Sequence, residues 1–312
     1  MSRYPILDRR LLFVTGKGGV GKTVVTATLA LHAFRRRKRV LIVELSPYGR
    51  IRELLGGPEP TTEPREIQPH LEIVRIDPRA ALEEFLQSLL PVRVLRQRLL
   101  QSSSFSILTA AAPGIEEFLV LSKIVSLETR RSGLRRRPAW DLIVVDSPAT
   151  GHSLPFLSTA RTLAEMMPVG PIGKMASEVA EVLADPRRCL AVVVTIPEEM
   201  AVNETIEIST SLRRSGAVSL GPLVVNAVWP ERFTPEEGRW LVAAADPADP
   251  LLAAGRYHVE RRRRCEEHLA RIRAELGTEP IILPFLTQSD AAHPPLRKLV
   301  GVFDTAFSVG AS

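Results

Sequence analysis

The sequence predicts an α/β fold, a doubly wound and mainly parallel sheet with helices on both faces and an inserted helical subdomain. Short, β-branched apolar runs recur along the chain, and stretches with helical periodicity separate each run from the next. An apolar content of 45% over 312 residues is enough to bury one large core. We therefore expect a single domain over 1–312, and no internal repeat is visible.

The apolar runs are the expected strands, because strands buried on both faces of a parallel sheet take this form. They are Leu11 to Thr15, Val40 to Leu45, Leu71 to Ile76, Leu142 to Val145, Leu190 to Ile196, Leu223 to Val228 and Ile281 to Leu283. No strand is expected in the interval 77–138, which we predict to be a helical insertion. A second insertion is predicted at 164–186. Its methionines, Met166, Met167 and Met175, fit either an adaptable apolar groove or ordinary helix faces.

The residues between the first expected strand and the first expected helix carry the clearest chemistry. They read GKGGVGKT, which satisfies GxxxxGK[ST] in its proper strand, loop and helix context. Glycines allow positive φ and a close approach of N–H groups to phosphate oxygens, and the helix N-terminus adds its dipole. We expect Lys22 at the β- and γ-phosphates and the Thr23 hydroxyl in the shell of a Mg²⁺ ion. The predicted phosphate-binding residues are Gly16, Lys17, Gly18, Gly19, Val20, Gly21, Lys22 and Thr23.

Later strands end in residues suited to the same site. Asp146 follows the apolar run of WDLIVVDSPATGHSLPFL and is expected at the carboxyl edge of the sheet, where it can bind Mg²⁺ through water. Its alternative role is a helix cap. Gly151 can offer its backbone N–H to a γ-phosphate and so report whether that phosphate is present. The Asn226 amide can read the adenine edge. ATP and Mg²⁺ are therefore the expected cofactors, with Thr23 and Asp146 at the metal.

Several motifs occur in a characteristic order: GKGGVGKT, APGIEEF, DSPATGHSLPFL, TIPEEMAVNETIEISTSLRRSG and VVNAVWP. In this order they resemble the arsenical-pump and tail-anchored-protein targeting ATPase family. The second lysine of the loop, Lys17, is similar to that of the wider class that includes MinD, ParA and the nitrogenase iron protein. There it reaches the partner's phosphates across a nucleotide-sandwich dimer. The resemblance thus implies a homodimer with Lys17 in trans, and it places Pro284 and Phe285 where the family closes over the base.

The chain departs from the family pattern in its first switch segment and in its cysteines. Ser46 stands where the family has an aspartate that positions or activates the attacking water, and a serine cannot accept that proton at neutral pH. Glu44 is the nearest replacement, with a structural or Mg²⁺-shell role as its alternative.

The zinc-binding CxxC of the targeting branch is absent, so no zinc is expected. Two remote cysteines, Cys189 and Cys265, do not favour a metalloid pump. The predicted catalytic residues are Lys17, Lys22, Glu44 and Asp146.

The net charge of +6 and the pI near 9.7 come from arginine clusters within 35–39, 135–137 and 261–264. We interpret these as solvated helix surfaces, with nucleic acid or anionic lipid as the alternative partner. Neither a membrane-length apolar run nor a signal-peptide core occurs, so we expect a cytoplasmic protein.

Together these observations predict an ATP-driven dimeric switch that captures or releases a protein or membrane client. A nucleotide-sensing scaffold with little hydrolysis is an alternative, because Ser46 replaces the water-activating aspartate. A ParA- or MinD-like positioning ATPase that binds DNA or a membrane is another.

Overall fold

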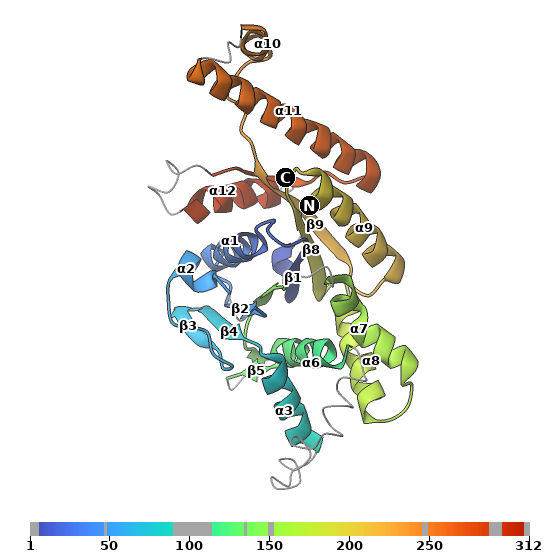
Figure 1. The fold of residues 1–312 in the computed structure, drawn as a ribbon. Coiled ribbons are helices and arrows are strands. Elements are labelled where there is room, and N and C mark those ends of the chain that lie inside the picture. The colour runs from blue at the N-terminus through green and yellow to red at the C-terminus, as the bar shows by residue number, and fades with distance from the viewer. Residues whose placement is uncertain are drawn as a thin grey trace.

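An eight-stranded sheet runs through the centre of the molecule in the order β10-β9-β8-β1-β7-β2-β4-β3 (Figure 1). The computed structural model describes residues 6–46, 49–89, 114–133, 136–148, 153–244, 249–286 and 295–308. The sheet strands are β1 (Leu11–Thr15), β2 (Val40–Glu44), β3 (Arg65–Gln68), β4 (Leu71–Arg75), β7 (Leu142–Asp146), β8 (Cys189–Thr195), β9 (Leu220–Val228) and β10 (Ile281–Pro284). All neighbouring pairs are parallel except β3 and β4. The predicted doubly wound, mainly parallel sheet is confirmed.

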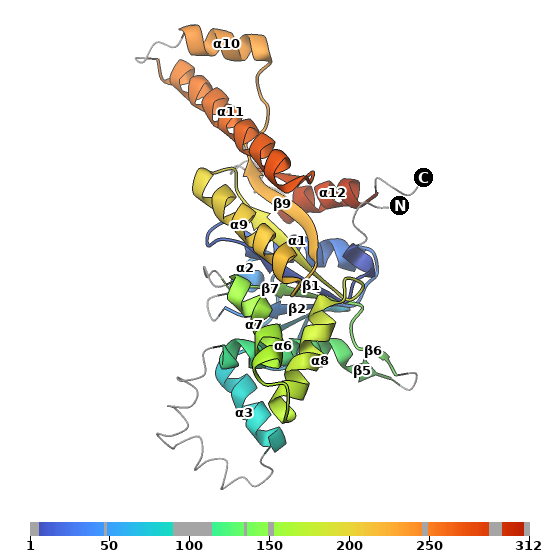
Figure 2. The same ribbon diagram turned by 90° about the vertical axis from the view of Figure 1, so that its right-hand side faces the viewer.

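Helices cover both faces of the sheet (Figures 1 and 2). Their bounds are η1 (Ile6–Asp8), α1 (Lys22–Arg35), α2 (Ile51–Leu55), α3 (Pro78–Leu89), α6 (Ile115–Thr129), α7 (Ser153–Met166), α8 (Pro171–Ala184), α9 (Glu199–Ser215), α10 (Pro235–Ala244), α11 (Pro250–Leu276) and α12 (Pro295–Ser308). None of these helices is both long and apolar enough to cross a lipid bilayer.

The alternation of side chains along each strand divides the interior into two cores. On β1, Leu11 and Phe13 face a core built with α6, α7, α8, α9 and α11. Leu12 and Val14 face the opposite core, built with α1 and α12. Successive side chains of a strand point to opposite faces, so a strand covered by helices on both sides must be apolar at every position. This explains the continuous apolar runs of the sequence.

Three short strands were not predicted. β3 adds an antiparallel edge strand to β4. β5 (Arg131–Ser132) and β6 (Arg137–Pro138) form a separate two-stranded sheet inside the interval expected to lack strands. β3 carries polar residues on an exposed edge, and β5 and β6 are two residues each, so none of the three has an apolar run to reveal it.

The described parts of the two predicted insertions are mainly helical. The interval 77–138 contains α3 and α6, and 164–186 contains the end of α7 and α8. These helices pack on one another at one end of the molecule (Figure 2). Met175 packs against the core, as an ordinary helix-face residue does, whereas Met166, the last residue of α7, is 73% exposed. An adaptable apolar groove at these methionines stays a prediction. The assignment of these stretches as insertions stays a prediction.

The last helix, α12, is docked on α1 through a buried histidine. His32 on α1 is fully buried, and its Nδ1 lies 3.0 Å from Asp304 Oδ1 on α12. Its ring packs against Phe303 and Phe307. His32 Nε2 is buried and has no hydrogen-bond partner among the described residues. Burial lowers the pKa of His32, and the Asp304 carboxylate only partly opposes this effect.

We predict that this histidine makes the fold less stable in mild acid. A histidine whose folded pKa lies below the unfolded value of about 6.5 favours the folded state above that pH, and the contribution is lost as the pH falls through the folded pKa. In urea unfolding followed by circular dichroism, the His32→Gln variant should lose less stability between about pH 7.5 and pH 5.5 than the wild type.

The matched control is His268→Gln, on the half-buried His268 of α11. An identical pH dependence of the wild type and His32→Gln would contradict the prediction.

Candidate functional site

The loop between β1 and α1 has the conformation that its glycines suggest. Gly16, Gly19 and Gly21 all have positive φ. A Cβ on Gly16 would lie 2.1 Å from the Val194 carbonyl oxygen of β8, so only glycine fits this close approach. Gly18 and Gly19 are exposed. The backbone thus turns tightly beside the neighbouring strand and presents its outer part to solvent.

Lys22 lies inside this loop. Its Nζ donates to the carbonyl oxygens of Gly16 at 3.0 Å and Lys17 at 2.9 Å. The side chain is buried, which lowers the pKa of Lys22, while the negative charges of Asp146 and Glu204 oppose that shift. These carbonyls hold the ammonium at the N-terminal end of α1, where a phosphate group would meet both the lysine and the helix dipole.

Asp146 is bound to α1 by two hydroxyl groups. Thr23 Oγ1 donates to Asp146 Oδ2 at 2.8 Å, and Thr26 Oγ1 donates to Oδ1 at 3.3 Å. Burial raises the pKa of Asp146 to about 6, against these hydrogen bonds and the charge of Lys22. Thr23 was predicted from the loop motif and Thr26 was not, although residues three apart on a helix lie on the same face.

The pairing of Thr23 with Asp146 suits a Mg²⁺ site. A hydroxyl and a carboxylate are the hard oxygen donors that Mg²⁺ prefers, and this ion usually completes its shell with water and substrate phosphates. No group of three or more His, Cys, Asp or Glu side chains with metal-binding geometry occurs among the described residues. Thr23 and Asp146 are therefore the residues that would hold the ion, together with the nucleotide.

Glu44 stands beside Asp146 but is held by other groups. The two residues are register partners of β2 and β7. Glu44 is fully buried, and its Oε2 accepts from Arg75 Nη2 at 2.9 Å. Its Oε1 lies 3.4 Å from the Ile51 backbone N of α2. A Cβ on Gly49 would overlap this carboxylate. The geometry is that of a structural carboxylate, and a catalytic role for Glu44 stays a proposal.

Lys17 does not point into its own phosphate cradle. Its Nζ lies 3.6 Å from Glu204 Oε2 on α9. Glu204 was not singled out from the sequence, although it lies within the TIPEEMAVNETIE segment that resembled the family. An acidic residue inside a motif of the site could have been noticed in the sequence. Its contact with Lys17 could not, because the two residues are far apart along the chain.

The two predicted base-binding segments lie at the ends of β9 and β10. Asn226 Nδ2 donates to the Val20 carbonyl oxygen at 3.0 Å, so this amide supports the phosphate loop in the present structure. The Phe285 ring stacks on Trp229 with centroids 5.0 Å apart. Adenine recognition by Asn226, Pro284 and Phe285 stays a prediction.

One predicted switch residue, Gly151, lies outside the described residues. Ser46, at the other switch, is half-buried just after β2.

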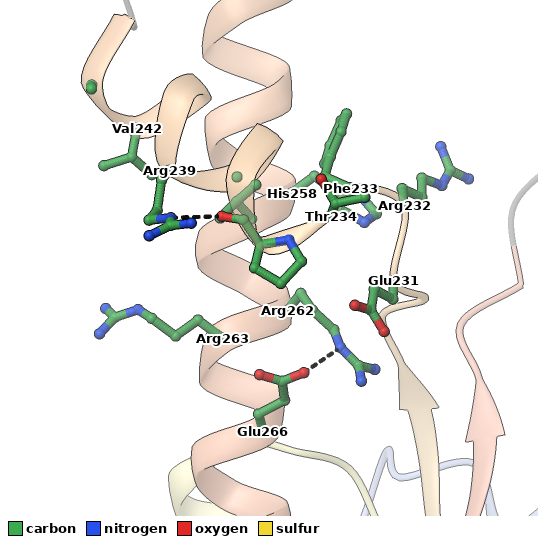
Figure 3. Close-up of a pocket in the computed structure, with 14 residues that line it drawn as sticks. Glu231, Arg232, Phe233, Thr234, Arg239, Val242, His258, Arg262, Arg263 and Glu266 are labelled. Atoms are coloured by element: carbon green, nitrogen blue, oxygen red, sulfur yellow. Dashed lines mark hydrogen bonds and ion pairs between the residues drawn. The ribbon is translucent and has the colours of Figure 1, made fainter.

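Two cavities lie along α11. The larger, about 710 Å³, is bounded by the ends of β8, β9 and β10, and Trp229, Tyr257 and Phe285 line it. The second, about 510 Å³, lies between α10 and α11 (Figure 3). Its lining includes Phe233 and the Arg262–Glu266 ion pair. No predicted site residue lines this second cavity.

The order of the sheet and the glycine loop between β1 and α1 are those of the phosphate-loop nucleoside triphosphatase fold. The sequence profile of the anion-transporting ATPase family matches residues 9–176, which is more than half of the 312 residues. The chain therefore belongs to this family, the ArsA and Get type of ATPase. Membership implies nucleotide binding.

Individual relatives are distant. ATPase BagA of Mycobacterium tuberculosis is 28% identical over 233 residues, which cover 73% of this chain and 68% of BagA. The arsenical pump-driving ATPase of Acidiphilium multivorum is 30% identical over 244 residues, 70% of this chain and 40% of that protein. ATPase get3 of Schizosaccharomyces japonicus is 30% identical over 150 residues, 47% of this chain and 43% of that protein.

We predict that Arg75 is needed to keep the Glu44 carboxylate in the fold. The variant Arg75→Met leaves a buried charge unpaired and should lower the free energy of unfolding by about 3 kcal/mol. Because Glu44→Gln removes that charge, the double variant should recover most of the loss. Urea unfolding of the single and double variants measures both effects.

Arg52→Met is the matched control, because Arg52 forms an ion pair with Glu59, and both side chains are exposed. It should cost less than about 1 kcal/mol. Equal stability of Arg75→Met and the wild type would contradict a structural role for the buried pair.

Proposed function

We propose that this chain is a Mg²⁺-dependent ATPase that acts as a dimeric switch, in which the nucleotide state controls binding of a protein or membrane client. The observation that carries the proposal is the meeting of Lys22, Thr23 and Asp146 at the N-terminus of α1. Lys22 Nζ lies 3.0 and 2.9 Å from two loop carbonyls, and Thr23 lies 2.8 Å from Asp146. These are the groups that a triphosphate and its metal ion need.

Each residue has a distinct part in this proposal. The loop amides and the α1 N-terminus bind the phosphate oxygens, and Lys22 exchanges its loop carbonyls for phosphate. Thr23 and Asp146 hold Mg²⁺, which neutralises phosphate charge when bound. Asn226 keeps the loop in place through its bond to Val20.

Lys17 supports the dimeric part of the proposal. The Lys22 side chain lies inside the phosphate loop of its own subunit. The Lys17 side chain is 30% exposed and points away from that loop, toward Glu204. A lysine in this position is available to the phosphates of a second copy.

The surface at the turn between α7 and α8 supports binding of a client. Met166 is 73% exposed and Val169 83% exposed, and α7 and α8 pack against α6. Exposed methionine and valine side chains offer an adaptable apolar contact. α12, by contrast, buries Leu299 and Phe303 in the core, which leaves its apolar face unavailable to a membrane.

A nucleotide sensor with little hydrolysis is the second candidate. Both Glu44 oxygens are engaged, by Arg75 and by the Ile51 N–H, so the nearest carboxylate to the Ser46 position is not free to accept a proton. A chain with this arrangement would bind ATP and change its conformation. It would hydrolyse ATP only if another group activated the attacking water.

We predict that Lys22→Ala removes the Mg²⁺-dependent ATP hydrolysis of the purified protein. The ammonium that binds the β- and γ-phosphates is lost, so turnover should fall roughly 10²-fold or more. Release of inorganic phosphate, with and without Mg²⁺, measures it.

Lys38→Ala, past the other end of α1, is the charge-matched control and should keep wild-type turnover. Hydrolysis that persists unchanged in Lys22→Ala would come from a contaminant and would count against the ATPase.

A second prediction separates the switch from the sensor. If the missing aspartate limits hydrolysis, Ser46→Asp should raise turnover by roughly 10²-fold, the usual contribution of a general base. Single-turnover hydrolysis with bound ATP is the measurement. Unchanged turnover in this variant would argue against the sensor interpretation, and Ser46→Asn controls for side-chain size without the charge.

A further inference from the structure

A carboxylate of its own subunit holds the Lys17 side chain. Lys17 Nζ lies 3.6 Å from Glu204 Oε2, and the two side chains are 30% and 28% exposed. Glu204 is on α9, which follows β8, and β8 pairs directly with β1. The sheet order therefore places the start of α9 beside the phosphate loop, and the ion pair lies at the rim of the site.

The ion pair is well placed but loose. Its distance exceeds that of a hydrogen bond, and a pair this accessible to solvent is weak. Lys22, in contrast, is buried and held by two carbonyl oxygens. Of the two loop lysines, only Lys17 can change partner at little cost in free energy.

We propose that Glu204 is a positioning residue that holds the Lys17 ammonium in its own subunit, in the place of the phosphate oxygens that Lys17 binds across the dimer. The inference rests on the proposed function, which supplies that contact in trans. A phosphate tail carries more negative charge than one carboxylate and accepts stronger charge-assisted hydrogen bonds. A partner subunit with ATP can therefore withdraw Lys17, and an empty partner cannot.

The exchange of partners links assembly to nucleotide. Without ATP, nothing in the partner subunit draws Lys17 away, and both Lys17–Glu204 pairs stay closed. With ATP in both subunits, each lysine exchanges a carboxylate for phosphate. Glu204 thus reduces the gain from the contact across the dimer and makes that gain depend on the triphosphate.

The test uses sedimentation of the full chain with Mg²⁺ and a slowly hydrolysed ATP analogue. Removing the charge with Glu204→Gln should lower the dimer dissociation constant by roughly 4- to 25-fold, because two pairs open per dimer and each contributes roughly two- to fivefold. Glu204→Asp, with a shorter side chain, should fall between this variant and the wild type. At about 1 M salt, where the Debye length is about 3 Å, the gain should disappear.

Glu207→Gln is the matched control. Glu207 is exposed one turn further along α9, so the substitution changes net charge equally without touching Lys17. It should leave the dissociation constant within about twofold of the wild type. Analogue affinity of dilute, unassembled subunits should also stay within about twofold in Glu204→Gln. If Glu204→Gln raised the analogue affinity of single subunits by as large a factor as it strengthened the dimer, the carboxylate would act on the bound nucleotide. That result would overturn the inference.

The outcomes separate the inference from the proposed function. If the wild type assembles with nucleotide and Glu204→Gln has the same dissociation constant as Glu207→Gln, Glu204 does not hold Lys17 and the inference fails alone. If the wild type stays monomeric at saturating nucleotide, the dimeric switch fails and the inference fails with it.

Discussion

The central position of β1, hydrogen-bonded to β7 on one side and β8 on the other, is the constraint on which the site depends. Val14 is the register partner of Asp146, and Thr15 is the partner of Val193. A strand paired on both sides cannot shift its carboxyl end, so the loop that leaves it starts from a fixed point. That point lies against the Val194 carbonyl, where only glycine fits at position 16. Asp146, Lys22 and the α1 N-terminus acquire their relative positions from this pairing.

Charge balance is the second feature of the site. Two lysines and two carboxylates, Lys17, Lys22, Asp146 and Glu204, meet around the loop, and each lysine already has a polar partner. A site built only for phosphate would leave uncompensated positive charge when empty, at a cost in stability. Here carbonyl oxygens hold Lys22 and a carboxylate holds Lys17. A phosphate group that bound here would replace partners that the two lysines already have.

The register of the sheet also connects the site to more distant segments. Asp146, Glu44 and Arg75 are neighbours across β7, β2 and β4, and Glu44 also accepts from the first residue of α2. These buried charges connect the carboxyl end of β7 to the start of α2. On the opposite side of β1, α9 carries Glu204 near its start and packs against the long α11, beyond which α10 exposes Trp240 (Figure 2). The candidate site therefore lies between two groups of helices: α3, α6, α7 and α8 on one side, and α10 and α11 on the other (Figure 2).

Local features of the chain could be predicted from its sequence: the apolar runs of the parallel strands, the glycine loop with Lys22 and Thr23, and the strand-end position of Asp146. Each depends on residues close in sequence, because strand periodicity, positive φ and helix starts are set within a few residues. The contacts of Lys17 with Glu204, of Glu44 with Arg75 and of Asn226 with Val20 are visible only in the folded structure. These pairs are distant in sequence and meet through the order of strands in the sheet. That order arises from long-range packing and hydrogen bonding, which no short segment of the chain encodes.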